Sequence, residues 1–302
     1  SGYGGSQNIL PPPPFAGAPA RPSNFHTISL GLLVFLPALI FFGISLGYAL
    51  LYHQMPALCW SFTALCVCLS ALFMIARPVR DGPRYWFNLG SLCLIATLAG
   101  NIVGQWNMHR HFSEYWAFEG QREYSNVQPG EPALNHLDAG KIFFSKGAHI
   151  EAKAAIGLAD GQRYCVAPIV GQSPMTTIEY WAAGVDCCSQ AGDFTCNDAG
   201  NENAHAGLVY LDYGPKQKYL EEFRRAAREV GAAHGMSPSE DALFVAWVED
   251  PGDAQHAYWK LGMTCLVVGA VIYFAISVLV GIMLHFGRRA PTAKSKLEIR
   301  NL

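Results

Sequence analysis

Three long stretches of the chain carry no charged side chain, and they constrain its fold more than any other feature. They run from Pro22 to Ala76, from Tyr85 to Trp106 and from Leu261 to Gly287. A helix needs about 20 apolar residues to cross a hydrocarbon core roughly 30 Å thick. The first stretch is long enough for two such helices and each of the others for one. The sequence therefore predicts four transmembrane helices.

We expect these helices at residues 28–52, 57–76, 85–105 and 261–286, with only a short turn between the first two. The segment between the third and fourth helices is long enough to form a domain with its own core. The predicted organisation is a Pro/Gly-rich N-terminal tail (1–26), three membrane helices (27–105), an outer domain (106–259), a fourth membrane helix (260–287) and a basic C-terminal tail (288–302).

The outer domain reads as α+β. Short apolar runs separated by Gly, Pro and Asp predict strands at residues 142–144, 148–156, 164–170, 177–183, 208–211 and 243–248. Pro215 is expected to open a helix that ends near His234, because apolar residues recur there on one helical face. The predicted fold class is a four-helix transmembrane bundle with an α+β, disulfide-stapled domain inserted between helices three and four.

Charge asymmetry predicts the orientation of the chain. The two tails and the loop 77–84 together carry nine basic and two acidic residues, whereas residues 106–259 carry 11 basic and 21 acidic ones. Short segments rich in Lys and Arg stay in the cytoplasm. We therefore expect cytoplasmic termini and a lumenal or extracellular outer domain.

Small residues recur inside the predicted spans at the spacing of helix contacts. Such residues let helix backbones approach closely in a membrane. They favour packing within one bundle, and contacts with other subunits are the alternative interpretation. The spans hold no Asp, Glu, Lys or Arg near mid-membrane, which argues against a pump or a proton-coupled transporter. The helix-packing residues are Gly43, Gly47, Ala96, Gly100, Gly104, Ser277 and Gly281.

Four of the nine cysteines lie in the outer domain, namely Cys165, Cys187, Cys188 and Cys196. An even number on an oxidising side predicts two disulfides. A bridge between the adjacent Cys187 and Cys188 would be strained, so one of them is expected to bind Cys165 and the other Cys196. Both remaining connectivities stay open. A zinc site with Asp186, Asp198 or His205 is a less favoured alternative, because adjacent cysteines fit the usual chelate spacing poorly.

A search for catalytic motifs leads to no catalytic, cofactor-binding or metal-binding assignment. His109, Arg110, His111 and Glu114 form a polar cluster at the predicted end of the third span, and an acidic loop surrounds the cysteines. His26, His53 and His285 lie near span ends, where histidine can ligate a haem or a chlorophyll, although a polar interfacial role is favoured. The basic C-terminal tail is expected to meet anionic lipid. The sequence suggests no nucleic-acid partner.

Four spans, a large second outer loop and the Cys187-Cys188 pair resemble the tetraspanins, although Ser189 stands where their motif has glycine. That resemblance implies architecture only. Three segments are similar to uncharacterised membrane proteins of dinoflagellates and related protists, which implies a shared outer domain and no known activity. These segments are RYCVAPIV (163–170), WAAGVDCC (181–188) and FTCNDAG (194–200).

The functional hypothesis is a non-enzymatic membrane subunit that scaffolds or anchors a larger assembly. Its expected partners are membrane lipid and other membrane protein subunits, possibly copies of itself. Two alternatives are an accessory subunit of a pigment-bearing or electron-transfer complex and a channel or transporter subunit.

Overall fold

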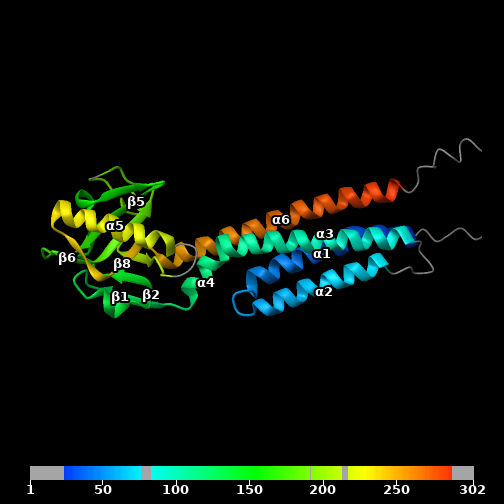
Figure 1. Cartoon of the computed structure of the whole chain (residues 1–302), viewed down its shortest axis with the longest axis horizontal. Helices are drawn as coiled ribbons and strands as arrows, with labels where there is room; N and C mark the ends of the chain where they lie inside the picture. Colours follow the sequence, from blue (N-terminus) through cyan, green and yellow to red (C-terminus); the bar gives the residue numbers. More distant parts are fainter. Residues whose placement is uncertain (1–23, 76–82, 191, 213–216, 288–302) are drawn as a thin grey trace, which may run out of the picture.

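The computed structural model describes residues 24–75, 83–190, 192–212 and 217–287. The molecule is elongated, with a bundle of long helices at one end and a domain built on a β-sheet at the other (Figure 1). The predicted N-terminal tail up to residue 23, most of the basic loop and the C-terminal tail lie outside the described residues.

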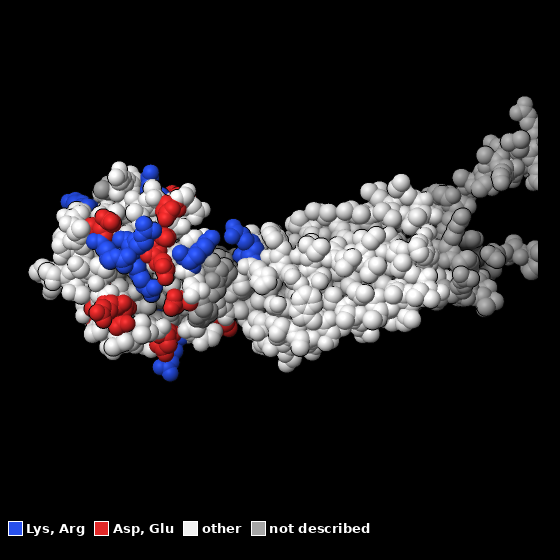
Figure 2. All heavy atoms as spheres, viewed as in Figure 1, with Lys and Arg blue, Asp and Glu red and all other residues white. Residues whose placement is uncertain are grey.

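Among the described residues, four helices are long and apolar enough to cross a membrane, as predicted. They are α1 (Asn24–Leu50), α2 (Pro56–Ile75), α3 (Pro83–Asn107) and α6 (Pro251–Gly287). On the face that Figure 2 shows, charged side chains lie on the domain and on the part of the helices next to it, whereas the rest of the helical part carries none. This separation follows from the high cost of placing a charge in hydrocarbon.

Helices α1 and α3 form the centre of the helical part. Helix α2 packs on α3, and α6 packs on α1, on opposite sides of the central pair (Figure 1). Only 22 % of the apolar window of α2 and 17 % of that of α6 are buried. Most side chains of the two outer helices are therefore available to lipid or to another protein.

The domain contains an eight-stranded mixed sheet. Its strands pair in the order β1-β2-β7-β8-β6-β5-β3, and β4 also pairs with β5. The pairs β1–β2 and β6–β8 are parallel, and the other pairs are antiparallel. The strands are β1 (Arg122–Val127), β2 (Ala139–Phe144), β3 (His149–Ile150), β4 (Ile156–Asp160), β5 (Gln162–Val170), β6 (Thr177–Val185), β7 (Ala206–Val209) and β8 (Ser237–Val248).

Most predicted strands have counterparts in this sheet, with two differences. The predicted strand at 148–156 is divided by a 3-10 turn (Ala152–Ala154) into β3 and β4. Strand β1 was not expected, because its sequence REYSNV is polar and mostly exposed.

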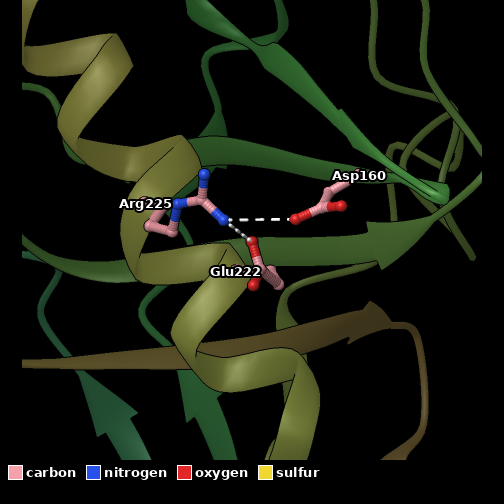
Figure 3. A network of polar contacts seen from close by, with 3 residues as sticks. All are labelled: Asp160, Glu222 and Arg225. Carbon is pink, nitrogen blue, oxygen red and sulfur yellow. Dashed lines mark hydrogen bonds and ion pairs between the residues drawn. The ribbon is translucent and has the colours of Figure 1, made fainter.

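Helix α5 (Gln217–His234) covers one face of the sheet. The side chains of Phe223 and Val230 are fully buried against that face, with Trp181 and Phe244 from the strands. Tyr180, next to Trp181 in β6, faces the other core with Trp247, as the two-residue period of a strand requires. Ion pairs also link α5 to the sheet. The guanidinium of Arg225 in α5 contacts Asp160 of β4 at 3.3 Å and Glu222 of its own helix at 2.6 Å (Figure 3).

Both connections between the helical part and the domain are helical. Helix α3 runs through a π-helical turn (Met108–Phe112) into α4 (Ser113–Glu119), and α6 begins three residues after the end of β8. The predicted domain boundaries at 105/106 and 259/260 therefore fall inside helical segments. The first strand of the sheet begins at Arg122 and its last strand ends at Val248.

Candidate functional site

The best-defined functional candidate is the junction, defined here as the turn 51–55, residues 107–119 and the first turns of α6. Aromatic rings from all three segments meet there. The ring centroid of Trp259 in α6 lies 5.2 Å from that of Phe112 and 5.9 Å from that of Trp116, and both pairs meet edge-on. The ring of His53 stacks on Trp116 at 4.0 Å. Edge-on and stacked aromatic pairs each stabilise a structure by about 0.5–1.5 kcal/mol beyond simple burial. These four rings, called the aromatic collar below, therefore hold the three segments together.

Hydrogen bonds reinforce the collar. Trp116 donates from Nε1 to the carbonyl oxygen of Ala49 at 3.2 Å, which links α4 to the end of α1. Gln255, which is 3 % exposed, donates from Nε2 to the carbonyl oxygen of Tyr115 at 3.1 Å and to Glu119 at 3.3 Å. These bonds run between segments far apart in the sequence, so they fix the position of α4 against both α1 and α6.

The π-helical turn Met108–Phe112 brings a second set of groups against α6. Asn107 donates from Nδ2 to the carbonyl oxygen of Gly262 at 2.9 Å. A Cβ at Gly262 would lie 2.8 Å from the Phe112 ring, so only glycine lets the ring approach so closely here. In the described structure the buried Oδ1 of Asn107 has no hydrogen-bond partner. Single π-turns inside α-helices are common at functional sites.

The predicted polar cluster at 109–114 is divided by this turn. His109 and Arg110 are exposed, whereas His111 and Glu114 are buried. His111 places Nε2 3.9 Å from the Sγ of Cys265. The side chains of His26 and His285 lie outside the part of the chain whose side chains are described.

The four outer cysteines form the disulfides Cys165–Cys188 and Cys187–Cys196. This is one of the two connectivities that the sequence left open. Three of the four sulfurs lie within 4.8 Å of one another, but each is already bonded to another sulfur and is therefore not a thiolate available to zinc. Ser189 donates hydrogen bonds from its backbone N–H and its hydroxyl to Asp193, which hold the pKa of that carboxyl below its ordinary value.

Several predicted helix-packing residues lie at close contacts between helices. A Cβ at Gly100 would lie 3.0 Å from the carbonyl oxygen of Phe41, and one at Gly104 would lie 2.9 Å from the ring of Tyr48. A Cβ at Gly281 would lie 2.6 Å from the side chain of Val34 of α1. Ala96 and Ser277 are buried.

Gly43 and Gly47 behave differently. A Cβ at either position would meet no atom within 4 Å among the described residues. The reason is that α1 faces α3 with Phe41, Ser45 and Tyr48, which lie on another side of the helix. The thiol of Cys59 in α2 does contact the carbonyl oxygen of Gly47 at 3.5 Å, but among the described residues neither glycine is at a place where a side chain would collide with another helix.

The contact face of α2 was not predicted from the sequence. Cys59, Thr63, Cys66 and Ser70 are its buried residues, and they recur at intervals of three and four, the period of one helix face. Gly90 of α3 meets this face, since its Cβ would lie 2.7 Å from the Ser70 carbonyl oxygen. The spacing of small and hydroxyl residues could have identified the face.

A hollow of about 780 Å³ lies beside the loop 171–176 and the end of α5. His149, Glu151, Lys153 and His234 line this open hollow. Within the described residues these four side chains form no hydrogen bond with one another. Three of them lie within residues 149–153 and His234 ends α5, and the described side chains show no hydrogen-bonded nucleophile–base pair of the kind used in catalysis.

Comparisons with known proteins gave no match: no family model, no curated protein and no solved structure is similar to this chain. The resemblance to tetraspanins and to protist membrane proteins therefore stays a prediction.

Proposed function

We propose that the chain is a non-enzymatic subunit that scaffolds or anchors a larger membrane assembly by holding its outer domain in a fixed position above the bilayer. The observation that carries the proposal is the junction. Two helical connections, one through α3 and α4 and one through α6, lead from the apolar part to the domain, and neither is interrupted by a loop. The aromatic collar and the hydrogen bonds of Trp116 and Gln255 then fix both helices against the end of α1.

This construction suits a structural part better than a flexible tether. Domains joined through exposed, Pro/Gly-rich linkers move relative to each other by default. Here the junction replaces such linkers with packed rings and buried polar groups, and it orders the backbone at both connections. A fixed domain is useful where it must meet partners at a defined height and angle.

The partners that we infer are membrane lipid and other membrane subunits, including further copies of this chain. The support is the low burial of α2 and α6, whose outward faces are apolar over most of their length. In a bilayer such faces meet either acyl chains or the helices of another subunit.

We also infer that the outer domain lies on the lumenal or extracellular side, with both termini in the cytoplasm. Two disulfides in the domain support this orientation, because disulfides persist in oxidising compartments. The excess of acids in residues 106–259 supports it as well. Protease added to sealed cells should cleave the domain and spare a tag at the C-terminus; the opposite pattern would refute the orientation.

The test of the scaffold proposal is to uncouple the outer domain from the junction. A six-residue Gly/Ser linker is inserted between Gly120 and Gln121 and a second one between Glu249 and Asp250, which lie just outside α4 and α6. The wild-type chain, extracted from its native membrane in mild detergent, should migrate as a large complex on native gels. The doubly loosened chain should be folded and inserted but should lose the complex.

Each single insertion is the matched control, because one continuous helix still holds the domain. The singly loosened chains should keep more of the complex than the double variant. Recovery of the wild-type chain only as a monomer would contradict the proposal, as would an undiminished complex in the double variant.

A further inference from the structure

The two disulfides of the outer domain lie side by side rather than at separate places in the fold. The Sγ atoms of Cys165, Cys187 and Cys196 all lie within 4.8 Å of one another, so the inner sulfur of one bridge faces both sulfurs of the other. Among the described residues Cys188 does not belong to this close group of three. The arrangement places a potential leaving group, Cys165, next to a second bond that it could attack.

Glycines make room for this arrangement. A Cβ at Gly184 would lie 2.6 Å from the sulfurs of both Cys187 and Cys196. A Cβ at Gly157 would lie 2.7 Å from the sulfur of Cys188. Any other residue at Gly184 or Gly157 would push against a disulfide, so the two bridges can lie together only because these strand positions lack side chains.

The two ends of the Cys165–Cys188 bridge differ in exposure. Cys165 is fully buried, whereas Cys188 is partly exposed and lines a hollow of about 470 Å³. Arg163 lines the same hollow and donates from Nη1 to the carbonyl oxygen of Cys188 at 3.0 Å. An approaching anion meets the guanidinium of Arg163 on the exposed side of the bridge, although Asp186 also lines this hollow.

We propose that the paired bridges form a thiol-exchange site, at which a thiolate enters at Cys188 and converts the observed pairing into Cys165–Cys187 and Cys188–Cys196. The substrate class is a thiol, carried by a small molecule or by another protein. The exchange moves the attachment of β5 by one residue along the loop that follows β6. The site thus gives the outer domain two covalent forms of the same oxidation state.

The steps balance without an oxidant or a reductant. The entering thiolate bonds to Sγ of Cys188 and breaks the bridge, so Cys165 leaves as a thiolate. Cys165 then bonds to Cys187 and expels Cys196 as a thiolate. Cys196 finally bonds to Cys188 and releases the entering thiolate unchanged.

The experiment uses the full chain in detergent with reduced glutathione as the thiol. Samples are quenched with acid, alkylated and cleaved before aspartate, which separates Cys165, the Cys187-Cys188 pair and Cys196 because aspartates stand at 186, 193 and 198. Fragmentation between the adjacent cysteines identifies each partner. We expect glutathione first on Cys188, followed by a gain of the Cys165–Cys187 and Cys188–Cys196 crosslinks. Glutathione appearing first on Cys187 or Cys196, or no new crosslink after Cys188 has reacted, would overturn the proposal.

Two variants provide a matched pair that needs no added thiol. Cys188→Ser leaves Cys165 as a free thiol beside the second bridge, and crosslinks of Cys165 to Cys187 or Cys196 should appear. Cys165→Ser leaves Cys188 free on the exposed side, where alkylation should capture it while Cys187–Cys196 stays intact. Equal behaviour of the two variants would contradict the assigned direction of exchange. The glutathione experiment on the unmodified chain decides the question even where a variant fails to fold.

Discussion

Asn107 and Gly262 join the two helical connections of the outer domain through one hydrogen bond, 2.9 Å from Nδ2 to the carbonyl oxygen. Gly262 lies at the start of the third uncharged stretch and Asn107 directly follows the second, so the bond lies at the ends of these stretches that are nearer to the domain. Asn107 is 3 % exposed, so water does not replace the bond when it is lost.

Replacing Asn107 with alanine should therefore destabilise the junction. A typical buried hydrogen bond contributes about 0.5–1.5 kcal/mol, and we expect a loss in that range, measured as a lower midpoint of thermal unfolding in detergent. Asn135→Ala is the control, because the side chain of Asn135 is exposed. An equal effect of the two substitutions would show that the Asn107–Gly262 bond does not stabilise the junction.

The contrast between Gly100 and Gly43 predicts two different outcomes of the same substitution. Leucine at position 100 would collide with the backbone of Phe41, and overpacking of this kind costs about 1–3 kcal/mol. Leucine at position 43 meets open space and should leave the monomer as stable as the wild type. Thermal unfolding of the two variants in detergent tests this order, and a more damaging Gly43→Leu would refute it.

Helix α5 is held mainly by burial rather than by its charges. Phe223→Ala should cost about 3–5 kcal/mol, the usual range for a buried phenylalanine, since this side chain is fully buried. Arg225→Ala should cost much less, because its side chain is 49 % exposed and its ion pairs are screened by salt. Denaturant unfolding at low and high salt checks this order; the Arg225 effect should shrink as salt is added, and the Phe223 effect should not.

The buried hydroxyl of Tyr180 should make the outer domain less stable at alkaline pH. Burial, followed by the nearby charges of Glu131 and Glu179, raises the pKa of Tyr180 above its ordinary value of 10.0. Above that pH the unfolded chain ionises this hydroxyl while the folded domain keeps it protonated, so unfolding releases a proton and stability falls as the pH rises. Denaturant unfolding at increasing pH measures the slope.

Tyr180→Phe is the control, because it removes the ionisable group and keeps the ring. The variant loses the 2.8 Å contact between the tyrosine hydroxyl and His136, so it should be less stable at neutral pH. Its alkaline slope should nevertheless be shallower than that of the wild type. Identical slopes would mean that Tyr180 ionises alike in both states.

The coarse architecture could be predicted because hydrocarbon imposes a simple rule on sequence. Stretches without charge predicted the four long apolar helices of the described residues, although α6 begins ten residues before the predicted start and α3 continues through the π-helical turn into α4. The four outer cysteines were separated correctly from those in the spans. The helix beginning near Pro215 was predicted from its apolar face, which Phe223 and Val230 do bury.

The remainder depends on contacts between distant segments. Cys165 of β5 lies between Gly157 of β4 and Gly184 of β6. Cys188 packs on the Gly157 side and Cys187 and Cys196 pack on the Gly184 side, and no local pattern encodes that arrangement. Likewise, Trp116 and Gln255 gain their roles from partners in other helices. The polar strand β1 escaped prediction because it pairs at an edge of the sheet, where one strand neighbour and one buried residue suffice.

The double helical connection has a mechanical consequence. A body carried on a single stem can swivel about it, but a body carried on two stems can turn only if both bend together. A force applied to the far end of the domain would thus bend or tilt the transmembrane helices. A tilt of α6 in the bilayer would in turn reorient the domain. Force and orientation can pass through this molecule in both directions.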